Sequence, residues 1–393
     1  MSRFEPNLRI PGPTGLPPSV RVAGGRQMIN HRGPAFAEIL SRIQAGMQPY
    51  FGTSGQVQVL SCAGTGGLEA AVVNVLSPGD RVLGISIGSF GDRIAKIASA
   101  YGANVDVMAA EWGWAAAADE VTERLRSGGG DYRAVLITHN ETSTAVMNPL
   151  HELIPAIRAA APDALVVVDS VSALGAVPFE MDAWGADVVV TASQKAWMAA
   201  PGLAMVAASE RAWAAMETAK MPRFYLDLRK HRESATSGET PWTPSIAVVF
   251  QVDEGLQLMG AEGMAGVFAR HEASAAATQA GLEALGFQLF AEAANRSKTV
   301  TAAWIPEDLD WKPFNADLRR RGLVVAGGQG KLTGKIFRIG HLGSVTVEEI
   351  IAAMATLEAA LLGAGRDVEP GRAVAAAQRA ALEAAGVRSG VPA

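Results

Sequence analysis

The chain has 393 residues, 49% of them hydrophobic and 19% charged, with a formal net charge of −5. This length allows one large domain with a well-buried core and a smaller second domain. The negative charge offers no basic surface for nucleic acid, no apolar run reaches membrane-spanning length, and the single cysteine, Cys62, excludes an internal disulfide and a cysteine-rich zinc site. Because the first residues lack the apolar core of a signal peptide, we expect a cytoplasmic protein.

The first half of the chain alternates predicted strands and helices after a Pro- and Gly-rich start. Residues 1–25 are predicted to form an extended arm. From about residue 55 onward, strands are predicted at 57–60, 81–87, 133–138, 164–168 and 187–191, with helices at 68–76, 92–101 and 150–160. Short strands separated by helices of this length indicate a three-layer α/β domain whose sheet is mostly parallel.

The second half is predicted to add a smaller α+β unit. Two long helical stretches within 245–285 lead into it, followed by strands at 299–304, 323–326 and 336–339 and helices at 313–321, 347–362 and 372–385. We therefore expect an N-terminal arm of residues 1–20, a large domain of residues 21–264 and a small C-terminal domain of residues 265–393.

A carboxylate and an amine follow two of the predicted strands. Asp169 ends the strand at 164–168, and Lys195 lies just past the strand at 187–191. Taken singly, Asp169 is a common cap and Lys195 an ordinary surface lysine. Together, in this order, they favour a pyridoxal phosphate site, where a lysine amine forms a Schiff base with the cofactor and a carboxylate pairs with its pyridine nitrogen.

A glycine-rich turn precedes the helix predicted at 68–76. The segment Ala63-Gly64-Thr65-Gly66-Gly67 offers backbone N–H groups, a helix N-terminus and the Thr65 hydroxyl to a phosphate. Glycines are common in tight turns of this kind, so the segment alone is weak evidence. It matches neither the dinucleotide motif nor the Gly-Lys-Ser/Thr of nucleotide triphosphate sites.

Further positions carry side chains that suit ligand binding. Phe90 follows the second predicted strand, where an aromatic ring either stacks on a flat cofactor or packs in the core. His139 opens a hydroxyl-rich segment that ends at Thr144, and His139-x-Glu141 resembles half of a zinc deaminase signature whose Pro-Cys-x-x-Cys half is missing. Arg338 lies on a predicted strand beside glycine-rich backbone, and its guanidinium suits a substrate carboxylate.

One competing pattern predicts a hydrolase. Gly84-Ile-Ser86-Ile-Gly88 fits the G-x-S-x-G nucleophile elbow after a strand, with His151 or His341 as the histidine that would follow. The pattern is short and glycine is abundant in this chain, at 42 residues, so this alternative ranks well below a pyridoxal phosphate enzyme.

Assembled in order, the motifs resemble the class V aminotransferases, specifically the alanine/serine–glyoxylate group, over roughly residues 8–362. The resemblance implies a fold-type I, pyridoxal-phosphate-dependent transferase. The motifs that carry it are Pro11-Gly-Pro13, Asn30-His-Arg-Gly-Pro34, Gly64-Thr-Gly66, Leu68-Glu-Ala-Ala-Val-Val-Asn74, His139-Asn-Glu-Thr-Ser-Thr144, Val168-Asp-Ser-Val-Ser172, Ser193-Gln-Lys195, Thr240-Pro-Trp-Thr243-Pro244 and Thr333-Gly-Lys-Ile-Phe-Arg-Ile-Gly340.

The resemblance implies a role for each matching position. Lys195 is then the Schiff-base lysine, Asp169 the partner of the pyridine nitrogen and Arg338 the arginine for the substrate carboxylate. Cofactor contacts are implied for Gly64, Thr65, Gly66, Phe90, Thr142, Gln194, Thr240 and Thr243, with Thr142 near the substrate as well. Thr243 matches a threonine that reaches the phosphate of the neighbouring subunit, which implies a homodimer with shared active sites. Phe90 departs from the tryptophan or tyrosine common in the family, and Thr240 departs from a tyrosine.

The activity implied by the resemblance is a ping-pong transfer of an amino group from a small amino acid to glyoxylate or a similar 2-oxo acid. Alanine or serine is favoured as donor, while aspartate, ureidoglycine and aminophosphonates remain open, and His31 and Arg32 are candidates to bind a second anionic group. The alternative on the same fold is a lyase or desulfurase. Cys62 lies beside the phosphate turn, which argues against a desulfurase, because that chemistry needs a cysteine on a mobile loop. A non-catalytic binding module on this fold is weaker still.

Overall fold

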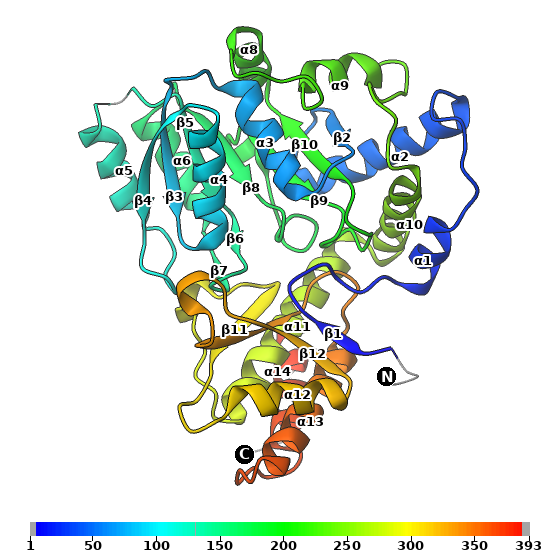
Figure 1. The fold of residues 1–393 in the computed structure, drawn as a ribbon, viewed down its shortest axis with the longest axis vertical. Helices are drawn as coiled ribbons and strands as arrows, with labels where there is room; N and C mark the ends of the chain where they lie inside the picture. The colour runs from blue at the N-terminus through cyan, green and yellow to red at the C-terminus, as the bar shows by residue number, and fades with distance from the viewer. Residues whose placement is uncertain (1–4, 130, 387–393) are drawn as a thin grey trace.

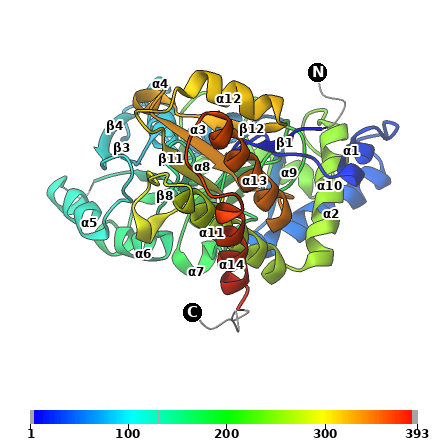
Figure 2. The same ribbon diagram turned by 90° about the horizontal axis from the view of Figure 1, so that it is seen from below.

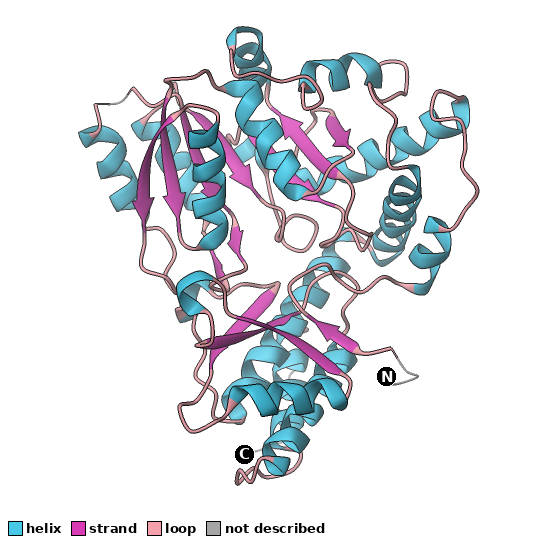
Figure 3. Cartoon of the chain, viewed as in Figure 1, coloured by secondary structure: helices cyan, strands magenta, loops and turns pink. Residues whose placement is uncertain are grey.

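The computed structural model describes residues 5–129 and 131–386, which build two main sheets surrounded by helices (Figures 1 and 3). A seven-stranded sheet occupies the upper part of Figure 1, and a four-stranded sheet occupies the lower part. No helix in the described part of the chain combines the length and apolar character needed to cross a membrane.

The strands of the seven-stranded sheet lie in the order β2-β10-β9-β8-β5-β3-β4. They are β2 (Val57–Leu60), β3 (Arg81–Ser86), β4 (Asn104–Ala109), β5 (Ala134–Thr138), β8 (Leu165–Asp169), β9 (Val188–Ala192) and β10 (Ala204–Ala208). Neighbouring strands are parallel except at β10, which runs antiparallel to both β2 and β9. The predicted mostly parallel α/β sheet is confirmed, and β4 and β10 are strands that the sequence patterns missed.

Helices cover both faces of this sheet and make the predicted three layers. One face carries α2 (Pro34–Phe51) and α6 (Leu150–Ala160), and the other carries α3 (Gly64–Val75), α4 (Ser89–Ala100) and α8 (Glu210–Thr218). On β8, Val168 packs in the core with α2 and α6, whereas Val167 packs in the core with α3, α4 and α8. Successive side chains of a strand point to opposite faces, so a valine-rich strand buried on both sides requires helices on both sides.

Several helix and strand boundaries differ from the prediction. α3 begins at Gly64 rather than 68, and α4 begins at Ser89 rather than 92, so the glycine-rich turn is the first turn of α3. The predicted extended arm contains the extended strand β1 (Asn7–Arg9) but also the helix α1 (Pro18–Gly24), so it is not extended throughout. The helices that the patterns missed are α1, α2, α5 (Ala118–Ser127), α7 (Met181–Trp184), α8 and α9 (Leu228–Ala235).

The four-stranded sheet combines both ends of the chain. Its order is β1-β12-β13-β11, with β11 (Val300–Trp304), β12 (Leu323–Gly327) and β13 (Ile336–Gly340). β1 pairs in parallel with β12 at the edge, so part of the N-terminal arm belongs to the C-terminal sheet. The domain boundaries after residues 20 and 264 remain predictions.

A group of helices buries this second sheet. They are α11 (Met264–Ala284), α12 (Trp311–Arg320), α13 (Val347–Gly363) and α14 (Arg372–Ala384); α10 (Ile246–Glu262) precedes them as the first of the two long predicted helices. Figures 1 and 2 both show α14 beside α11, where Ala277, Ala373 and Ala377 share one core. Because alanine side chains are short, the two helices pack closely, and the predicted alanine-rich helix is confirmed.

Candidate active site

The carboxyl ends of β5, β8 and β9 meet at the edge of the large sheet that faces the small sheet (Figure 1). Ligands of open α/β sheets bind at such an edge. Asp169 is the last residue of β8, and Lys195 follows β9. A cavity of about 240 Å³ opens here, lined by Gly12, Pro13, Ala63, Gly64, Thr65, Leu68, Phe90, Arg93, Asp169, Val171, Gln194, Lys195 and Pro201. It unites six of the predicted positions, namely Gly64, Thr65, Phe90, Asp169, Gln194 and Lys195.

A larger cavity lies elsewhere in the molecule. Its volume is about 620 Å³, it lies between α6 and α11, and it contains neither Lys195 nor Asp169. Because volume alone supplies no chemistry, we place the candidate site at the smaller cavity, which holds the amine and the carboxylate.

Asp169 is a buried carboxylate with few partners. The residue is 4% exposed, and its Oδ1 accepts one hydrogen bond, from the Val171 N–H at 3.0 Å. Burial raises the pKa of this carboxyl to about 6, while the Val171 bond and the charge of Lys195 oppose the shift. A protonated ring nitrogen beside Asp169 would stabilise its charged form, so the residue fits the pyridine nitrogen of pyridoxal phosphate.

Lys195 is half-buried and supplies the amine of the site. Burial lowers the pKa of this amine to about 8, and Asp169 opposes the shift. The guanidinium groups of Arg338 and Arg93 lower this pKa further. At neutral pH, a lysine whose pKa is lowered has a larger fraction of neutral amine. The neutral amine is the form that acts as nucleophile and base.

The N-terminal arm crosses directly over this lysine. Lys195 Nζ donates a hydrogen bond to the Pro11 carbonyl, and the Thr14 hydroxyl donates to the Lys195 carbonyl at 3.1 Å. Gly12, between them, has a φ of +134°, and a Cβ there would lie 2.5 Å from Lys195 Nζ. Glycine is therefore required at this position for two reasons, its backbone conformation and its contact with the amine.

The first turn of α3 fits a phosphate. The Gly67 N–H donates to the Ala63 carbonyl at 3.2 Å, so the N–H groups of Gly64, Thr65 and Gly66 have no acceptor within the helix. A Cβ at Gly67 would lie 2.8 Å from side-chain carbons on β9 and β10. Glycine thus lets the helix approach the sheet and presents its free N–H groups to the cavity.

Phe90 lines the cavity from the first turn of α4. Its N–H donates to the Glu141 carboxylate at 2.9 Å, and the guanidinium carbon of Arg93 lies 4.5 Å from its ring centroid. Sequence reasoning missed Arg93 as a site residue, although its spacing from Phe90 places both on one helix face. Glu141 appeared in the zinc half-signature and in the family motif from His139 to Thr144, but no sequence signal connected it to α4.

Arg338 and Thr142 lie together beside the cavity but do not line it. Arg338 donates to the Gly327 carbonyl through Nε at 2.9 Å and Nη2 at 2.7 Å, and to the Thr142 carbonyl through Nη1 at 2.7 Å. Burial lowers the pKa of this guanidinium to about 10. Within residues 5–129 and 131–386, Arg338 forms no ion pair, so a buried cation is held here by carbonyl groups alone.

The remaining predicted positions lie outside the cavity of their own chain. Gly66 belongs to the first turn of α3 without lining the cavity, and Thr240 and Thr243 lie on the loop between α9 and α10. The Thr240 hydroxyl donates to a backbone carbonyl of that loop at 2.8 Å. His31 and Arg32 also lie apart from the cavity, and Arg32 pairs with a glutamate at 2.8 Å.

The hydrolase alternative lacks a histidine at its serine. The Ser86 hydroxyl donates to Asp92 Oδ1 at 2.6 Å. The ring of His341 instead bonds with the Thr301 hydroxyl at 2.9 Å, and His151 lies on α6. The Ser86 hydroxyl therefore has no general base of the kind that the elbow pattern requires.

Cys62 does not fit the desulfurase alternative. Burial raises the pKa of its thiol to about 12, so the thiol stays protonated at neutral pH. Its side chain packs against the first turn of α3, where a Cβ at Gly66 would lie 2.8 Å from the Cys62 Cβ. Cys62 therefore does not provide the nucleophilic thiolate on a mobile loop that a desulfurase needs.

The family model described as aminotransferase class-V matches residues 20–339. The chain belongs to the class V aminotransferases. The resemblance predicted from the motifs is confirmed, together with the fold-type I architecture and pyridoxal phosphate as the cofactor. The buried Asp169, the amine of Lys195 and the free N–H groups of α3 match the three chemical groups of this cofactor.

Three proteins that are similar to this chain carry different names. A protein of Synechococcus sp. named soluble hydrogenase, small subunit, is 40% identical over 375 residues, covering 95% of this class V aminotransferase and 97% of its own length. The L-aspartate–glyoxylate aminotransferase of Paracoccus denitrificans is 37% identical over 373 residues and covers 94% of each chain. The crystal structure of pyridoxamine–pyruvate aminotransferase from Mesorhizobium loti matches with a TM-score of 0.91 and 30% identity, covering 98% of this chain and 99% of its own. A single cysteine cannot supply the ligand set of an iron–sulfur cluster, so the hydrogenase name has no counterpart in these residues.

Proposed function

We propose that this class V aminotransferase transfers the amino group of a small amino acid, with alanine or serine favoured, to glyoxylate by a ping-pong mechanism. The observation that carries the proposal is the single cavity that holds Lys195, Asp169 and the first turn of α3. Glyoxylate appears in the name of the Paracoccus relative, which supports it as acceptor here. We also propose that the protein acts in the cytoplasm, where its lone Cys62 stays reduced.

Each group of the cavity has a distinct task in this proposal. The amine of Lys195 holds the cofactor and then moves the proton at the substrate Cα, a task suited to a pKa that burial lowers to about 8. Asp169 faces the ring nitrogen and stabilises its protonated form, and the N–H groups of Gly64 and Thr65 bind the phosphate. The bound cofactor supplies an electron-withdrawing ring that makes the Cα proton acidic.

Arg338 is proposed to bind the α-carboxylate of the substrate. Its guanidinium is buried among carbonyl groups, and burial lowers its pKa to about 10. The charge of Glu141 raises the pKa of Arg338, but no ion pair joins Arg338 to another described residue. A substrate carboxylate would stabilise this buried cation and match the fork of its N–H groups. One guanidinium for one carboxylate favours monocarboxylic donors such as alanine and serine.

An acidic donor is the second candidate. Arg93 lines the cavity, contacts the Phe90 ring, and forms no ion pair with any residue that the structure describes. A second guanidinium at the cavity suits the second carboxylate of aspartate, the donor in the name of the Paracoccus relative. If aspartate is the donor, Arg93→Gln is expected to raise KM for aspartate and leave KM for alanine unchanged.

The test of the function is spectroscopic. The protein is loaded with pyridoxal phosphate, and its visible absorption is recorded while alanine, serine or aspartate is added singly. We expect one donor to bleach the band and glyoxylate to restore it. Absence of a band after loading, or a band that no donor changes, would overturn the proposal.

We further propose a homodimer with shared active sites. Phe224 and Tyr225 are 68% and 43% exposed, and both stack on Trp242, with ring centroids 4.8 and 6.2 Å apart. This aromatic cluster lies next to Thr243, the residue whose motif match implies contact with the neighbouring subunit. Exposed aromatic clusters of this kind are typical of protein interfaces.

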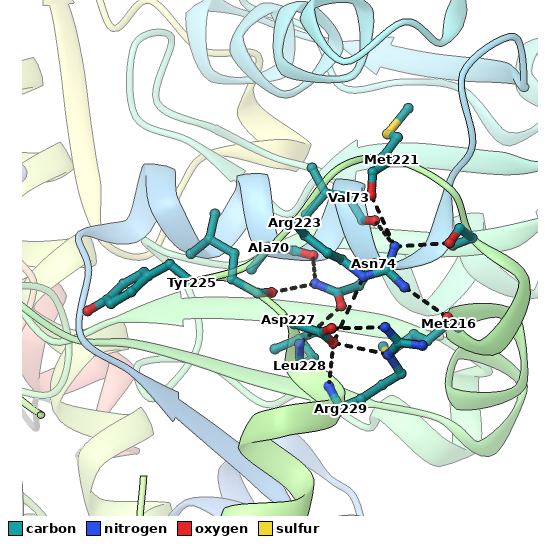
Figure 4. Close-up of polar contacts among 12 residues, drawn as sticks. Ala70, Val73, Asn74, Met216, Met221, Arg223, Tyr225, Asp227, Leu228 and Arg229 are labelled. Carbon is teal, nitrogen blue, oxygen red and sulfur yellow. Dashed lines mark hydrogen bonds and ion pairs between the residues drawn. The ribbon is translucent and has the colours of Figure 1, made fainter. Parts of the chain in front are cut away.

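Polar contacts fasten the loop of the aromatic cluster to the end of α3 (Figure 4). Asn74 donates to the Leu226 carbonyl at 2.7 Å and accepts the Leu228 N–H at 3.0 Å, and Arg223 donates to the Val73 carbonyl at 3.1 Å. The cluster is therefore presented on a well-anchored loop. Sedimentation is expected to show a dimer that Phe224→Asp dissociates. A monomeric wild-type protein with full activity would contradict shared sites.

A further inference from the structure

Glu141 is a fully buried carboxylate for which the proposed function has no role. The residue is 0% exposed, and its Oε2 accepts the N–H groups of Phe90 and Gly91 at 2.9 and 3.0 Å. Its Oε1 accepts the N–H and the hydroxyl of Ser143 at 3.1 and 2.6 Å. Each oxygen thus accepts two hydrogen bonds. An ionised carboxylate can accept all four, whereas an amide or a protonated acid cannot, because one of its two polar groups is a donor. Burial raises the pKa of this carboxyl, and the bonds from Ser143, Gly91 and Phe90 oppose the rise.

The carboxylate forms the N-terminal cap of α4 from outside that helix. Gly88 precedes the helix and has no side chain that could cap it, and the Ser89 N–H donates to Ser143 Oγ at 3.0 Å. Glu141 and Ser143 together satisfy the N–H groups of the first three residues of α4. A helix N-terminus has free N–H groups and partial positive charge, so an anion there is stabilised. A Cβ at Gly88 would lie 2.5 Å from Glu141 Cγ, which shows how closely the two segments pack.

This first turn of α4 carries the aromatic ring of the cavity. Phe90 lines the cavity with Lys195, and its own N–H is a donor to Glu141. Thr142 directly follows Glu141 in the chain, and its carbonyl accepts a hydrogen bond from Arg338 at 2.7 Å. A displacement of this segment would therefore disturb both the Phe90 ring and one of the three hydrogen bonds of the Arg338 guanidinium.

We propose that Glu141 is a positioning residue that holds Phe90 against the cofactor ring through the N–H groups of the first turn of α4. The inference rests on the proposed function and on the cofactor contact that the family resemblance implies for Phe90, which lines the cavity. A carboxylate that merely stabilised the helix would leave cofactor affinity unchanged, so the two roles are separable. Glu358 is the matched comparison: it is 6% exposed, and it accepts the N–H groups of Gly371 and Ala373 at 3.0 and 2.6 Å where α14 begins, in the part of the molecule built on the small sheet.

The experiment compares Glu141→Gln with Glu358→Gln as apoproteins. The readouts are the melting temperature and the dissociation constant for pyridoxal phosphate from an absorbance titration. Both variants are expected to melt at lower temperature, because each places an amide against buried N–H groups. Only Glu141→Gln is expected to raise the dissociation constant, by about five- to tenfold, the loss that corresponds to one aromatic contact. Equal affinity in the two variants would overturn the inference, while the aminotransferase proposal is judged separately on wild-type turnover.

A double variant tests whether Glu141 acts through the ring. In the Phe90→Leu background, Glu141→Gln is expected to change the dissociation constant by less than about twofold, because the group it positions is gone. A further full loss in the double variant, or wild-type affinity in Phe90→Leu alone, overturns the inference. If Glu141→Gln does not fold, Ser143→Ala keeps the carboxylate and removes one of its donors. That variant is expected to weaken cofactor binding about two- to threefold, and unchanged affinity would again overturn the inference.

Discussion

Two acid–cation pairs lie at opposite ends of the neighbouring strands β8 and β9, and they differ in how their charges are satisfied. Asp187, just before β9, is 1% exposed. Its carboxylate accepts hydrogen bonds from the Arg158 guanidinium, from the Ser209 hydroxyl at 2.7 Å and from the Val166 N–H at 2.8 Å. This pair has the full set of partners that a buried salt bridge needs.

Asp169 is also buried and Lys195 is half-buried, but their polar groups have fewer partners. Asp169 accepts one hydrogen bond on its carboxylate, and no ion pair joins it to Lys195 within the described ranges of the chain. Burial raises the pKa of Asp169 to about 6 and lowers that of Lys195 to about 8. We propose that the number of partners, and not burial, separates the charges of Asp187 and Arg158, which stabilise the fold, from those of Asp169 and Lys195, which serve the proposed chemistry.

Lys195→Ala should give the largest effect. Turnover is expected to fall by at least about 10²–10⁴-fold, the contribution of a positioned acid–base group, while the melting temperature of the apoprotein stays close to that of the wild type. Steady-state assays with the best donor and a thermal melt measure the two quantities. Arg158→Ala is the control: it should lower the melting temperature and leave turnover per folded enzyme intact. Near-normal turnover in Lys195→Ala would end the assignment of this lysine.

Asp169→Asn should slow the reaction next most strongly. The loss of the charge proposed to pair with the ring nitrogen is expected to lower turnover by about 10²–10³-fold, the usual effect of removing one preorganised electrostatic partner. The free energy of unfolding of the apoprotein should stay unchanged or rise, because the buried carboxylate that is removed accepts only one hydrogen bond in the described structure, from the Val171 N–H. Denaturant unfolding measures this, and a clear destabilisation would place Asp169 with Asp187 among the structural charges.

Asp187→Asn should show the opposite pattern. The free energy of unfolding is expected to fall by about 3 kcal/mol. The reason is that the NH₂ group of the new asparagine can take the place of the carboxylate oxygen that accepts hydrogen bonds from Arg158 and the Val166 N–H. Turnover per folded molecule should remain at the wild-type value at a temperature where the variant is native. If activity fell while stability did not, the comparison between the two pairs would be wrong.

The smallest effect concerns pH. In the proposed function the neutral amine of Lys195 captures the cofactor, and burial lowers the pKa of this amine to about 8. The rate of capture by the apoprotein should therefore rise about tenfold per pH unit below pH 8 and level off above it. Asp169 raises this pKa, and Asp169→Asn should therefore move the midpoint to lower pH. Stopped-flow absorbance after mixing with pyridoxal phosphate reports the rate. A midpoint that moves to higher pH would show that the Asp169 carboxylate does not raise the pKa of Lys195.

Strands buried on both faces were the easiest elements to predict. Valine-rich runs such as 164–168 and 187–191 have a pattern that depends on local composition alone. β10 was missed because Ala204–Ala208 is short and alanine-rich, and its antiparallel pairing depends on β2 and β9. β1 was taken for an extended arm because its partner β12 lies more than three hundred residues along the chain, at Leu323–Gly327.

The sequence by itself determined the α/β class, the family, and the order of Asp169 and Lys195, because these depend on residue type and on spacing along one strand or turn. Only the tertiary structure decided that Gly12 crosses the lysine, that Arg93 enters the cavity, and that Glu141 caps α4. These contacts join segments distant in sequence, and hydrogen bonding across them depends on how helices and strands pack. No local pattern encodes a partner supplied by another element of the fold.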